Sequence, residues 1–506
     1  MAAGLTLRRV DKALDTALVW FRRDLRAEDH AALFHALKAA HRVHAVFVLD
    51  RDILDPLLAR SLKADRRVEF IRDSLVDLDS QLHTLGQAHG ATGAGLIVLH
   101  GHARDEIPLL ANELHVQAVY ANHDDEPVAL ARDAQVRGRL SQAGIAMHTS
   151  KDHLIFERSE VMSAGETPLA TFAAYRNTWL KRLVPASLNA YPVATHGSSL
   201  VPLPERWRGG VPAVAEIGFE STNLQELKIT PGSVGAQALF EDFLQRIHHY
   251  DQTRDFPAVK GPSYLSTHLR FGTLSIRQLA REAHRLASAG SKGAELWLDG
   301  LIRRDFYHQI LHHYPHVVSR SFHAEYDAIR WEQGRQARQD FAAWSEGRTG
   351  YPLVDAAMAQ INQTGYMHYR LRVLVAGFLV KHLGIDWRRG ERYFADRLND
   401  FDLAVNNGGW QWAAGTGCDA QSHSRIVDPI AQSRKLDPGG KFIRRYLPQL
   451  SSLSDESIHA PWRASPADLS AAGVRIGSNY PSPIVEHEAA RARASDRYSA
   501  AKAHRS

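Results

Sequence analysis

The sequence contains a single cysteine, Cys418, and no run of the roughly 18 apolar residues that a membrane-spanning helix needs. One cysteine excludes an internal disulfide and any paired-cysteine zinc or redox motif, which leaves a buried structural thiol as the expected role. Residues 1–12 contain no apolar stretch long enough for a secretion signal. We therefore expect a cytoplasmic protein without a membrane partner.

Internal repeats, low-complexity tracts and a strong excess of one charge are also absent. The net charge of +5 is a slight basic bias that weakly favours a phosphate-bearing partner such as DNA. Hydrophobic residues make up 44% of the chain, which excludes a mainly disordered protein. The chain has 506 residues, whereas one hydrophobic core stops growing near about 250–300 residues, so we expect two domains.

The first part of the chain alternates short β-branched runs with amphipathic stretches. The runs that we interpret as strands are 17–21, 43–49, 95–100, 116–122 and 145–150. This alternation is typical of a parallel, doubly wound sheet, and such sheets bind ligands in the crevice beyond their strand ends.

Two further segments follow this predicted α/β domain of residues 1–153. In residues 154–237 the periodicity fades and Pro and Gly recur, which indicates a long interdomain connection. Apolar residues then recur at helical spacing from 238 to 506, most clearly at 294–313, 353–361 and 369–383. The predicted fold class is an α/β N-terminal domain followed by an all-α C-terminal domain, which ends in a short polar helix at 486–506.

The densest group of polar and aromatic residues lies within 387–429. Thirteen residues there hold two aspartates, two asparagines, two glycines and two tryptophans, namely Asp400, Asp402, Asn406, Asn407, Gly408, Gly409, Trp410 and Trp412. Such side chains can grip the edge and hydroxylated tail of an aromatic cofactor, and glycine lets the backbone approach it closely. By chemistry alone, a helix start with capping residues and core tryptophans explains the stretch equally well.

Several motifs in order resemble the photolyase and cryptochrome family, closest to its bacterial cyclobutane-dimer photolyases. They are WFRRDLR (20–26), RDFP (254–257), EGRTGYPLVDAAM (346–358), FDLAVNNGGWQWAAGTG (401–417) and YPSPIVEHEAAR (480–491). The resemblance runs from about 17 to about 498. It implies a helical FAD-binding domain and a monomeric, light-dependent deoxyribodipyrimidine photo-lyase that repairs UV-induced pyrimidine dimers in DNA by photoinduced electron transfer.

The resemblance also implies which residues bind FAD. Asp400, Phe401 and Asp402 fall where the family contacts the flavin ring and ribityl chain, and Asn406 falls where a side chain faces flavin N5. The implied phosphate-holding turn consists of Gly261, Pro262, Ser263, Tyr264, Leu265 and Ser266, and the other implied cavity residues are Tyr250, Trp297, Arg304 and Arg372. Taken alone, the serines would more often be helix caps, and the arginines would more often form surface salt bridges.

Trp410, Trp387 and Trp331 align with the family's electron-transfer chain between the flavin and the surface. In the absence of the resemblance, buried tryptophan is usually a packing residue.

The predicted substrate pocket departs from the repair pattern at four positions. Gly300 stands where repair enzymes carry an acid, Arg303 where they carry a stacking tryptophan, Tyr369 where they carry an asparagine and Val373 where they usually carry methionine. Trp412, which suits stacking on an extruded base, is retained, as is Arg254 of the RDFP motif. His423 in the altered segment 421–424 is a weaker candidate contact, because a structural histidine is the commoner case.

The sequence also bears on a second chromophore and on a metal ion. Asn122 and Glu126 lie where relatives hold a light-harvesting antenna, so the resemblance leaves open a second chromophore of unknown identity. The pairs 248–249 and 312–313 are adjacent histidines without an indicated third ligand, so we expect no metal site.

Three functions follow from these features. The favoured one is light-driven repair of pyrimidine dimers in double-stranded or single-stranded DNA. The alternative is a cryptochrome-like blue-light photoreceptor, or a photolyase-like protein without dimer repair, because the pocket is altered. Repair of a different lesion is the third, since pocket residues and not the fold select the base.

Overall fold

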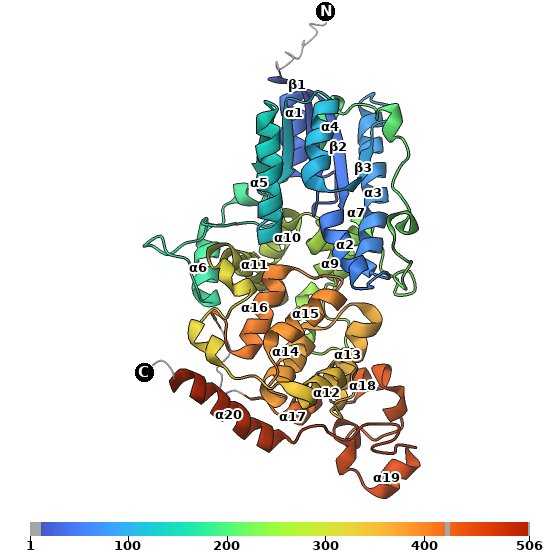
Figure 1. Ribbon diagram of the computed structural model, residues 1–506, viewed down its shortest axis with the longest axis vertical. Helices are drawn as coiled ribbons and strands as arrows, with labels where there is room; N and C mark the ends of the chain where they lie inside the picture. Colours follow the sequence, from blue (N-terminus) through green and yellow to red (C-terminus); the bar gives the residue numbers. More distant parts are fainter. Residues whose placement is uncertain (1–11, 420–425, 504–506) are drawn as a thin grey trace, which may run out of the picture. The chain divides into compact units, whose positions relative to one another are not determined.

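The computed structural model describes residues 12–419 and 426–503, which fall into two units that alternate along the chain (Figure 1). Unit 1 holds the chain through Ile155 together with Val184–Ala238 and His268–Leu279. Unit 2 holds Phe156–Leu183, Leu239–Thr267 and the chain from Ala280 onward. The segment 154–237, predicted as a connection, therefore contributes to both units, and its role as a linker remains a prediction.

Unit 1 is built on a five-stranded parallel sheet with the strand order β3-β2-β1-β4-β5. The strands are β1 (Leu14–Phe21), β2 (Ala40–Asp50), β3 (Leu96–Gly101), β4 (Ala118–Asn122) and β5 (Ala146–Ser150). Each predicted run falls on one of them, which confirms the doubly wound α/β prediction. The order changes direction between β1 and β4, so the carboxyl ends of these strands form the switch point where this architecture binds ligands.

Helices cover both faces of the sheet (Figure 1). They are α1 (Ala31–Ala39), α2 (Arg51–Ala59), α3 (Arg66–Ala88), α4 (Ala103–Glu113) and α5 (Pro127–Gln142). Val19 and Phe21 of β1 share one core with α1 and α3, whereas Leu18 and Trp20 share the opposite core with α4 and α5. This division follows from the two-residue period of a strand, which sends successive side chains to opposite faces.

A buried charge network joins the segment 268–279 to the rest of unit 1. Asp152 accepts hydrogen bonds from Arg26 Nη2 at 2.7 Å and from Arg277 Nη2 at 2.8 Å. Burial opposes ionisation of Asp152, but the two adjacent guanidinium groups lower its pKa well below the usual value. Arg277 also bonds Asp29, so the positive charges are matched by two carboxylates.

Unit 2 is helical, as predicted (Figure 1). Its helices are α6 (Phe172–Arg182), α8 (Tyr250–Thr253), α11 (Lys292–His313), α12 (Gly334–Ser345), α13 (Pro352–Thr364), α14 (Tyr369–Gly377), α15 (Trp387–Arg397), α16 (Leu403–Ala414), α17 (Pro429–Leu436), α18 (Lys441–Tyr446), α19 (Pro466–Ala471) and α20 (His487–Ala503). Three more helices, α7 (Gly232–Leu244), α9 (Ser266–Phe271) and α10 (Ile276–Ser288), contain residues of both units. The predicted stretch 369–383 is α14 followed by a π-helical turn at Phe378–His382. No helix in the described ranges is long and apolar enough to cross a membrane.

Two of the sequence motifs meet inside unit 2 at Asp355 of α13. Its carboxylate accepts hydrogen bonds from the backbone N–H groups of Thr349 and Gly350 at 2.7 and 3.0 Å, and from the Tyr480 hydroxyl at 2.9 Å. Burial raises the pKa of Asp355 to about 6, while these donors oppose the rise. Residues of the motifs 346–358 and 480–491 therefore form one hydrogen-bonded cluster in the core.

Candidate functional site

Arg372 of α14 and Asp400, which precedes α16, form an ion pair in unit 2. Arg372 Nη2 lies 2.8 and 3.1 Å from the two carboxylate oxygens, and Nε donates to the Met367 carbonyl at 2.9 Å. The side chain of Asp400 is 7% exposed, against 26% for Arg372. The arginine therefore supplies the counter-charge that a nearly buried carboxylate requires.

Asp402 and Asn406 are positioned by the start of α16. Asp402 is its N-cap, accepting from the Val405 N–H at 3.3 Å, and its carboxylate pairs with His308 Nε2 of α11 at 3.3 Å. One turn later, Asn406 Nδ2 donates to Glu391 of α15, to Oε1 at 2.9 Å and to the carbonyl at 3.2 Å. Burial raises the pKa of Glu391, while Asn406 opposes the rise. Glu391 was missed from the sequence, although it lies one helical turn after Trp387.

An aromatic wall joins Tyr250 to Trp297. The Phe243 ring lies 4.8 Å from that of Trp297 and 5.7 Å from that of Tyr250, measured between centroids. Arg254 places its guanidinium 5.2 Å from the Tyr250 ring centre. Arg304 follows Trp297 by two turns of α11 and is buried, so helical spacing places both residues on one face.

The turn predicted to hold phosphate has an unusual backbone. A Cβ on Gly261 would lie 2.6 Å from the Thr253 carbonyl oxygen, so only glycine fits there, and Tyr264 adopts a left-handed conformation with φ of 59°. Ser263 Oγ accepts from the Leu265 N–H at 3.4 Å, which is a local turn contact. Leu265 is buried, Pro262 is partly buried, and Ser266 is exposed as the first residue of α9.

Tyr366 lies among four of the predicted cofactor residues and was not itself predicted. Its ring centroid is 5.4 Å from that of Tyr264. Burial raises its pKa, as do the neighbouring Tyr264, Asp400 and Tyr250, whereas Arg372 lowers it. The phosphate turn and the Arg372–Asp400 pair therefore meet at this ring. Its position three residues before Tyr369, a predicted substrate residue, was the available sequence signal.

The three predicted electron-transfer tryptophans lie in or against the core of unit 2. Trp410 and Trp387 are buried members of one hydrophobic cluster, and Trp331 packs against it. A Cβ on Gly390 would lie 2.1 Å from the Trp410 ring, so this glycine makes room for the tryptophan. Trp331 also packs edge-on against Tyr498 of α20, with centroids 6.5 Å apart. These contacts fulfil a packing role, and electron transfer remains a prediction.

Tyr369, at the start of α14, is held by charged side chains. Its hydroxyl accepts from Arg254 Nε at 3.0 Å and donates to Asp255. Arg370 bonds the same carboxylate at 2.7 and 3.0 Å. The two guanidinium groups lie 5.1 and 5.0 Å from the tyrosine ring centre. Burial and the Asp255 carboxylate raise the pKa of Tyr369 to about 12, so it stays protonated.

The two altered positions on α11 differ in their surroundings. Gly300 is exposed, and a Cβ there would meet no heavy atom within 4 Å. Arg303 places its guanidinium over the ring of Phe172 from α6, 3.6 Å from the ring centre. Phe172 falls in the predicted connection and was not expected to belong to the site.

Val373 and Trp412 border a common cavity of about 260 Å³. Its wall is completed by the other residues Arg370, Leu374, Gly377, Phe378, Lys381, His382, Val427, Pro429 and Gln432. The segment 421–424 with His423 lies outside the described residues. Cys418 is partly buried, and burial raises the pKa of its thiol to about 12, in keeping with the expected structural role.

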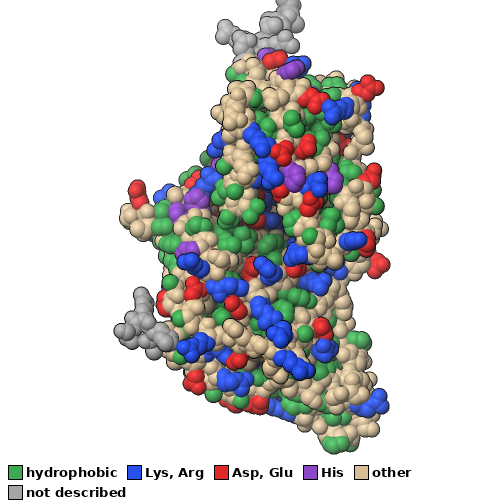
Figure 2. Space-filling view, in the orientation of Figure 1, with side chains coloured by type: hydrophobic (Ala, Val, Ile, Leu, Met, Phe, Trp, Pro, Cys, Tyr) green, Lys and Arg blue, Asp and Glu red, His purple; other side chains and the backbone are tan. Residues whose placement is uncertain are grey.

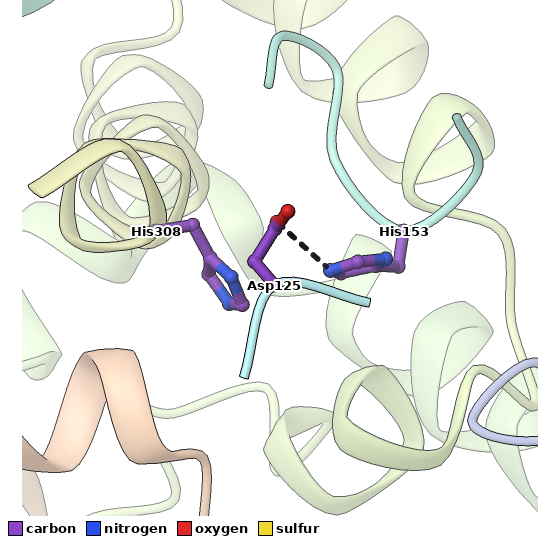
Figure 3. Close-up of side chains that lie close together, drawn as sticks. All are labelled: Asp125, His153 and His308. Atoms are coloured by element: carbon purple, nitrogen blue, oxygen red, sulfur yellow. Dashed lines mark ion pairs between the residues drawn. The ribbon is translucent and has the colours of Figure 1, made fainter. Parts of the chain in front are cut away.

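The predicted antenna residues lie at the switch point of unit 1. Asn122 Nδ2 donates to Asp24 at 2.7 Å, and Glu126 pairs with Arg23 at 3.1 Å. Between them, Asp125 forms an ion pair with His153 at 3.9 Å (Figure 3). Figure 3 also labels His308, the unit 2 residue already described with Asp402. Protein partners thus engage both antenna positions.

The adjacent histidine pairs make ordinary polar contacts. His248 bonds the Ser291 hydroxyl at 2.9 Å, and His313 bonds the Arg158 carbonyl at 3.3 Å.

The donor set of unit 2 fits FAD. Buried or partly buried arginines match a pyrophosphate, carboxylates and amides match the flavin edge and the ribityl hydroxyls, and the aromatic wall matches a planar ring. Gly261 has a separate, internal role, since its missing side chain lets the turn pack against the Thr253 backbone.

Known proteins resemble this chain over nearly its whole length. A family model described as the FAD binding domain of DNA photolyase matches residues 297–500, and one described as DNA photolyase matches residues 17–193. A deoxyribodipyrimidine photo-lyase from Vibrio cholerae is 36% identical over 486 residues, which cover 93% of this chain and 96% of the relative.

Solved structures agree with these matches. A class III photolyase from Agrobacterium tumefaciens superposes with a TM-score of 0.85 at 30% identity, covering 99% of this chain and all of that one. An archaeal photolyase from Sulfolobus tokodaii gives 0.78 at 31% identity, covering 96% of this chain and 99% of its own, and it holds two FAD molecules that imply a novel light-harvesting cofactor. The chain belongs to the DNA photolyase family and carries that family's FAD-binding domain.

Proposed function

We propose that this protein is a light-dependent lyase that repairs UV-induced pyrimidine dimers in DNA, acting as a monomer in the cytoplasm. The observation that carries the proposal is the cavity of about 260 Å³, because two independently predicted substrate residues, Val373 and Trp412, border it. The indole ring of Trp412 suits stacking on an extruded base. The positively charged Arg370, which also lines the cavity, suits binding of the adjoining phosphate.

Residues of unit 2 are proposed to bind the cofactor. FAD, when bound, supplies the light absorption and the electron that the reaction requires. Arg372 would hold a flavin or phosphate oxygen while its other donors keep Asp400 in place. The remaining proposed contacts are Tyr250, Gly261, Pro262, Ser263, Tyr264, Leu265, Ser266, Trp297, Arg304, Phe401, Asp402 and Asn406.

Side chains of this protein are proposed to border the flavin and to transfer an electron. Glu391 accepts a hydrogen bond from the Asn406 amide and burial raises the pKa of its carboxyl, so this pair would border the proposed flavin position. Trp410, Trp387 and Trp331 would conduct an electron inward from the surface. Each has the buried or partly buried environment that lowers the solvent reorganisation of such a step.

The surface of unit 2 supports binding to DNA. Figure 2 shows Lys and Arg side chains gathered over α12, α14 and α15 on the viewed face. The exposed arginines of these helices are Arg335, Arg338, Arg370, Arg392 and Arg397. Such charge attracts the phosphate backbone of either single-stranded or double-stranded DNA, and salt weakens the attraction.

A photoreceptor without repair activity is the second candidate. Tyr369 favours it, because a large ring clamped by Arg254 and Asp255 stands where repair enzymes are expected to keep a small asparagine. Arg254 and Asp255 both bond the tyrosine hydroxyl, so the ring is fixed at this position.

Illumination of the purified, photoreduced protein with dimer-containing oligonucleotides separates the two candidates. Single-stranded and double-stranded substrates are compared, and restored thymines are counted against a dark control. We expect restoration on at least one substrate. Normal flavin photoreduction without restored thymines would contradict dimer repair and favour the photoreceptor.

A further inference from the structure

Arg388 of α15 carries its positive charge over a residue of the predicted electron path. Its guanidinium carbon lies 4.7 Å from the centre of the Trp387 ring, and Trp387 is 1% exposed. Consecutive residues of a helix point about 100° apart, so helix geometry alone does not bring these two side chains together. Partners outside α15 are therefore needed to hold the guanidinium over the ring.

The structure supplies these partners from the segment that precedes α12. Arg388 Nε donates to the Ser319 carbonyl at 2.8 Å, and Nη2 donates to Asp327 Oδ1 at 2.7 Å. Nη1 lies 3.3 Å from Oδ1 of Asp386, the N-cap of α15. Burial opposes ionisation of Asp327, but the hydrogen bonds that it accepts lower its pKa, so its carboxylate is charged at neutral pH. Three acceptors therefore fix the guanidinium over the indole ring.

The indole N–H of Trp387 has no hydrogen-bond acceptor among the described residues, and its Nε1 atom is buried. A tryptophan ring that loses one electron becomes a radical cation, and it becomes neutral only when it releases this proton. In its buried position the oxidised ring would therefore keep its positive charge. A guanidinium repels such a ring, whereas it attracts the electron-rich face of the neutral indole.

We propose that Arg388 is a positioning residue for electron transfer, whose charge disfavours the oxidised state of Trp387 so that the electron hole passes on to Trp331. The inference rests on the proposed electron path and deepens it. In that path Trp410 gives one electron to FAD, Trp387 gives one to Trp410, and Trp331 gives one to Trp387. The net change is one electron lost by Trp331 and one gained by FAD, and the Trp387 proton stays in place.

The test isolates Trp387 with the replacement Trp331→Phe, so that the hole can travel no further. After a laser flash on the protein with oxidised FAD, transient absorption follows the decay of the tryptophan radical cation. Arg388→Gln removes the charge and stabilises the hole on Trp387, so it should lengthen this lifetime about 2- to 30-fold, the equivalent of a cation–π interaction. Arg388→Lys keeps the charge, so its lifetime should lie closer to the parent than to Arg388→Gln.

Asp327→Asn provides a change of the opposite sign. Asparagine keeps an acceptor oxygen for Arg388 but removes the counter-charge, so the lifetime should shorten about 1.5- to 5-fold, the range of a partly exposed ion pair. Both replacements break the same ion pair. A purely structural role of that pair would move the two lifetimes in the same direction, and urea unfolding measures the loss of stability separately.

Arg389→Gln is the matched control. Arg389 is the next residue of α15 and carries the same charge, and its guanidinium lies 4.2 Å from the ring centre of Phe341, outside the predicted electron path. The replacement changes the net charge by the same amount as Arg388→Gln and should leave the lifetime unchanged.

The outcomes separate this inference from the proposed function. Equal lifetimes for Arg388→Gln and Arg389→Gln would overturn the role of Arg388 and leave the electron path standing. Lifetimes that move the same way in Arg388→Gln and Asp327→Asn would also overturn it, because the ion pair would then be structural. If Trp387→Phe photoreduces its flavin at the wild-type rate, the path itself fails, and this inference fails with it.

Discussion

Replacing Arg372 with alanine tests whether this side chain contributes to FAD binding. The change removes an ion pair with Asp400 and a hydrogen bond to the Met367 carbonyl. Breaking a buried pair by removing one partner costs about 3–5 kcal/mol, because the other charge stays buried. Arg372 is 26% exposed, so solvent screening reduces the expected cost to about 2–3 kcal/mol.

If FAD binding requires Asp400 in its observed position, the free energy of FAD binding weakens by the same amount. About 2–3 kcal/mol corresponds to a dissociation constant about 30- to 150-fold higher. The assay is titration of flavin-free protein with FAD, followed by flavin fluorescence, together with urea unfolding of each variant without FAD.

Two controls sharpen this experiment. Arg372→Lys keeps the charge but loses the forked donor geometry, so we expect an intermediate loss. Arg338→Ala, on the exposed surface of α12, should leave FAD affinity unchanged. FAD binding by Arg372→Ala within threefold of wild type would refute the reasoning, and lost stability with unchanged affinity would assign the pair to folding alone.

Three further predictions concern the core, the electron path and the pocket. Asp152→Asn should destabilise unit 1 by about 3–5 kcal/mol in urea unfolding at neutral pH, since the buried Arg26 loses the Asp152 carboxylate while Arg277 keeps that of Asp29. Because its folded pKa is lowered, this stabilisation is complete above the unfolded value of about 3.9 and is lost as pH falls towards the folded value, so the variant's deficit should shrink in acid; a constant deficit would argue against the charge explanation. Trp410→Phe should slow light-driven bleaching of oxidised FAD, and an unchanged rate would remove this residue from the path. Tyr369→Asn combined with Gly300→Glu should raise affinity for a dimer-containing oligonucleotide, and equal affinity would show that neither residue limits the pocket.

Local patterns predicted much of the fold because they are set by the chain's own geometry. The five strands and the long helices follow from periods of two and 3.6 residues, which burial against any core enforces. The π-helical turn at Phe378–His382 escaped prediction, since one added residue in a helical turn leaves the apolar spacing nearly intact. The sequence motifs also identified Asp400, Asp402 and Asn406 as one cluster, because they lie within two helical turns.

Such patterns did not predict contacts between residues that lie on different elements of the chain. Glu391 reaches Asn406 across two packed helices, and the Tyr369 hydroxyl meets Asp255 across more than a hundred residues. Phe172 lies in a segment without clear periodicity, yet it forms the seat of Arg303.

The amino-acid sequence by itself determined the two-part architecture, the family motifs and the positions where this chain departs from the repair pattern. Those features are local or ordered along the chain, so they can be recognised from the sequence alone. Tertiary structure decided which charges are neutralised, which rings support a guanidinium and where open space remains. These properties depend on side-chain contacts between elements, whose distances and burial are created only when the chain packs.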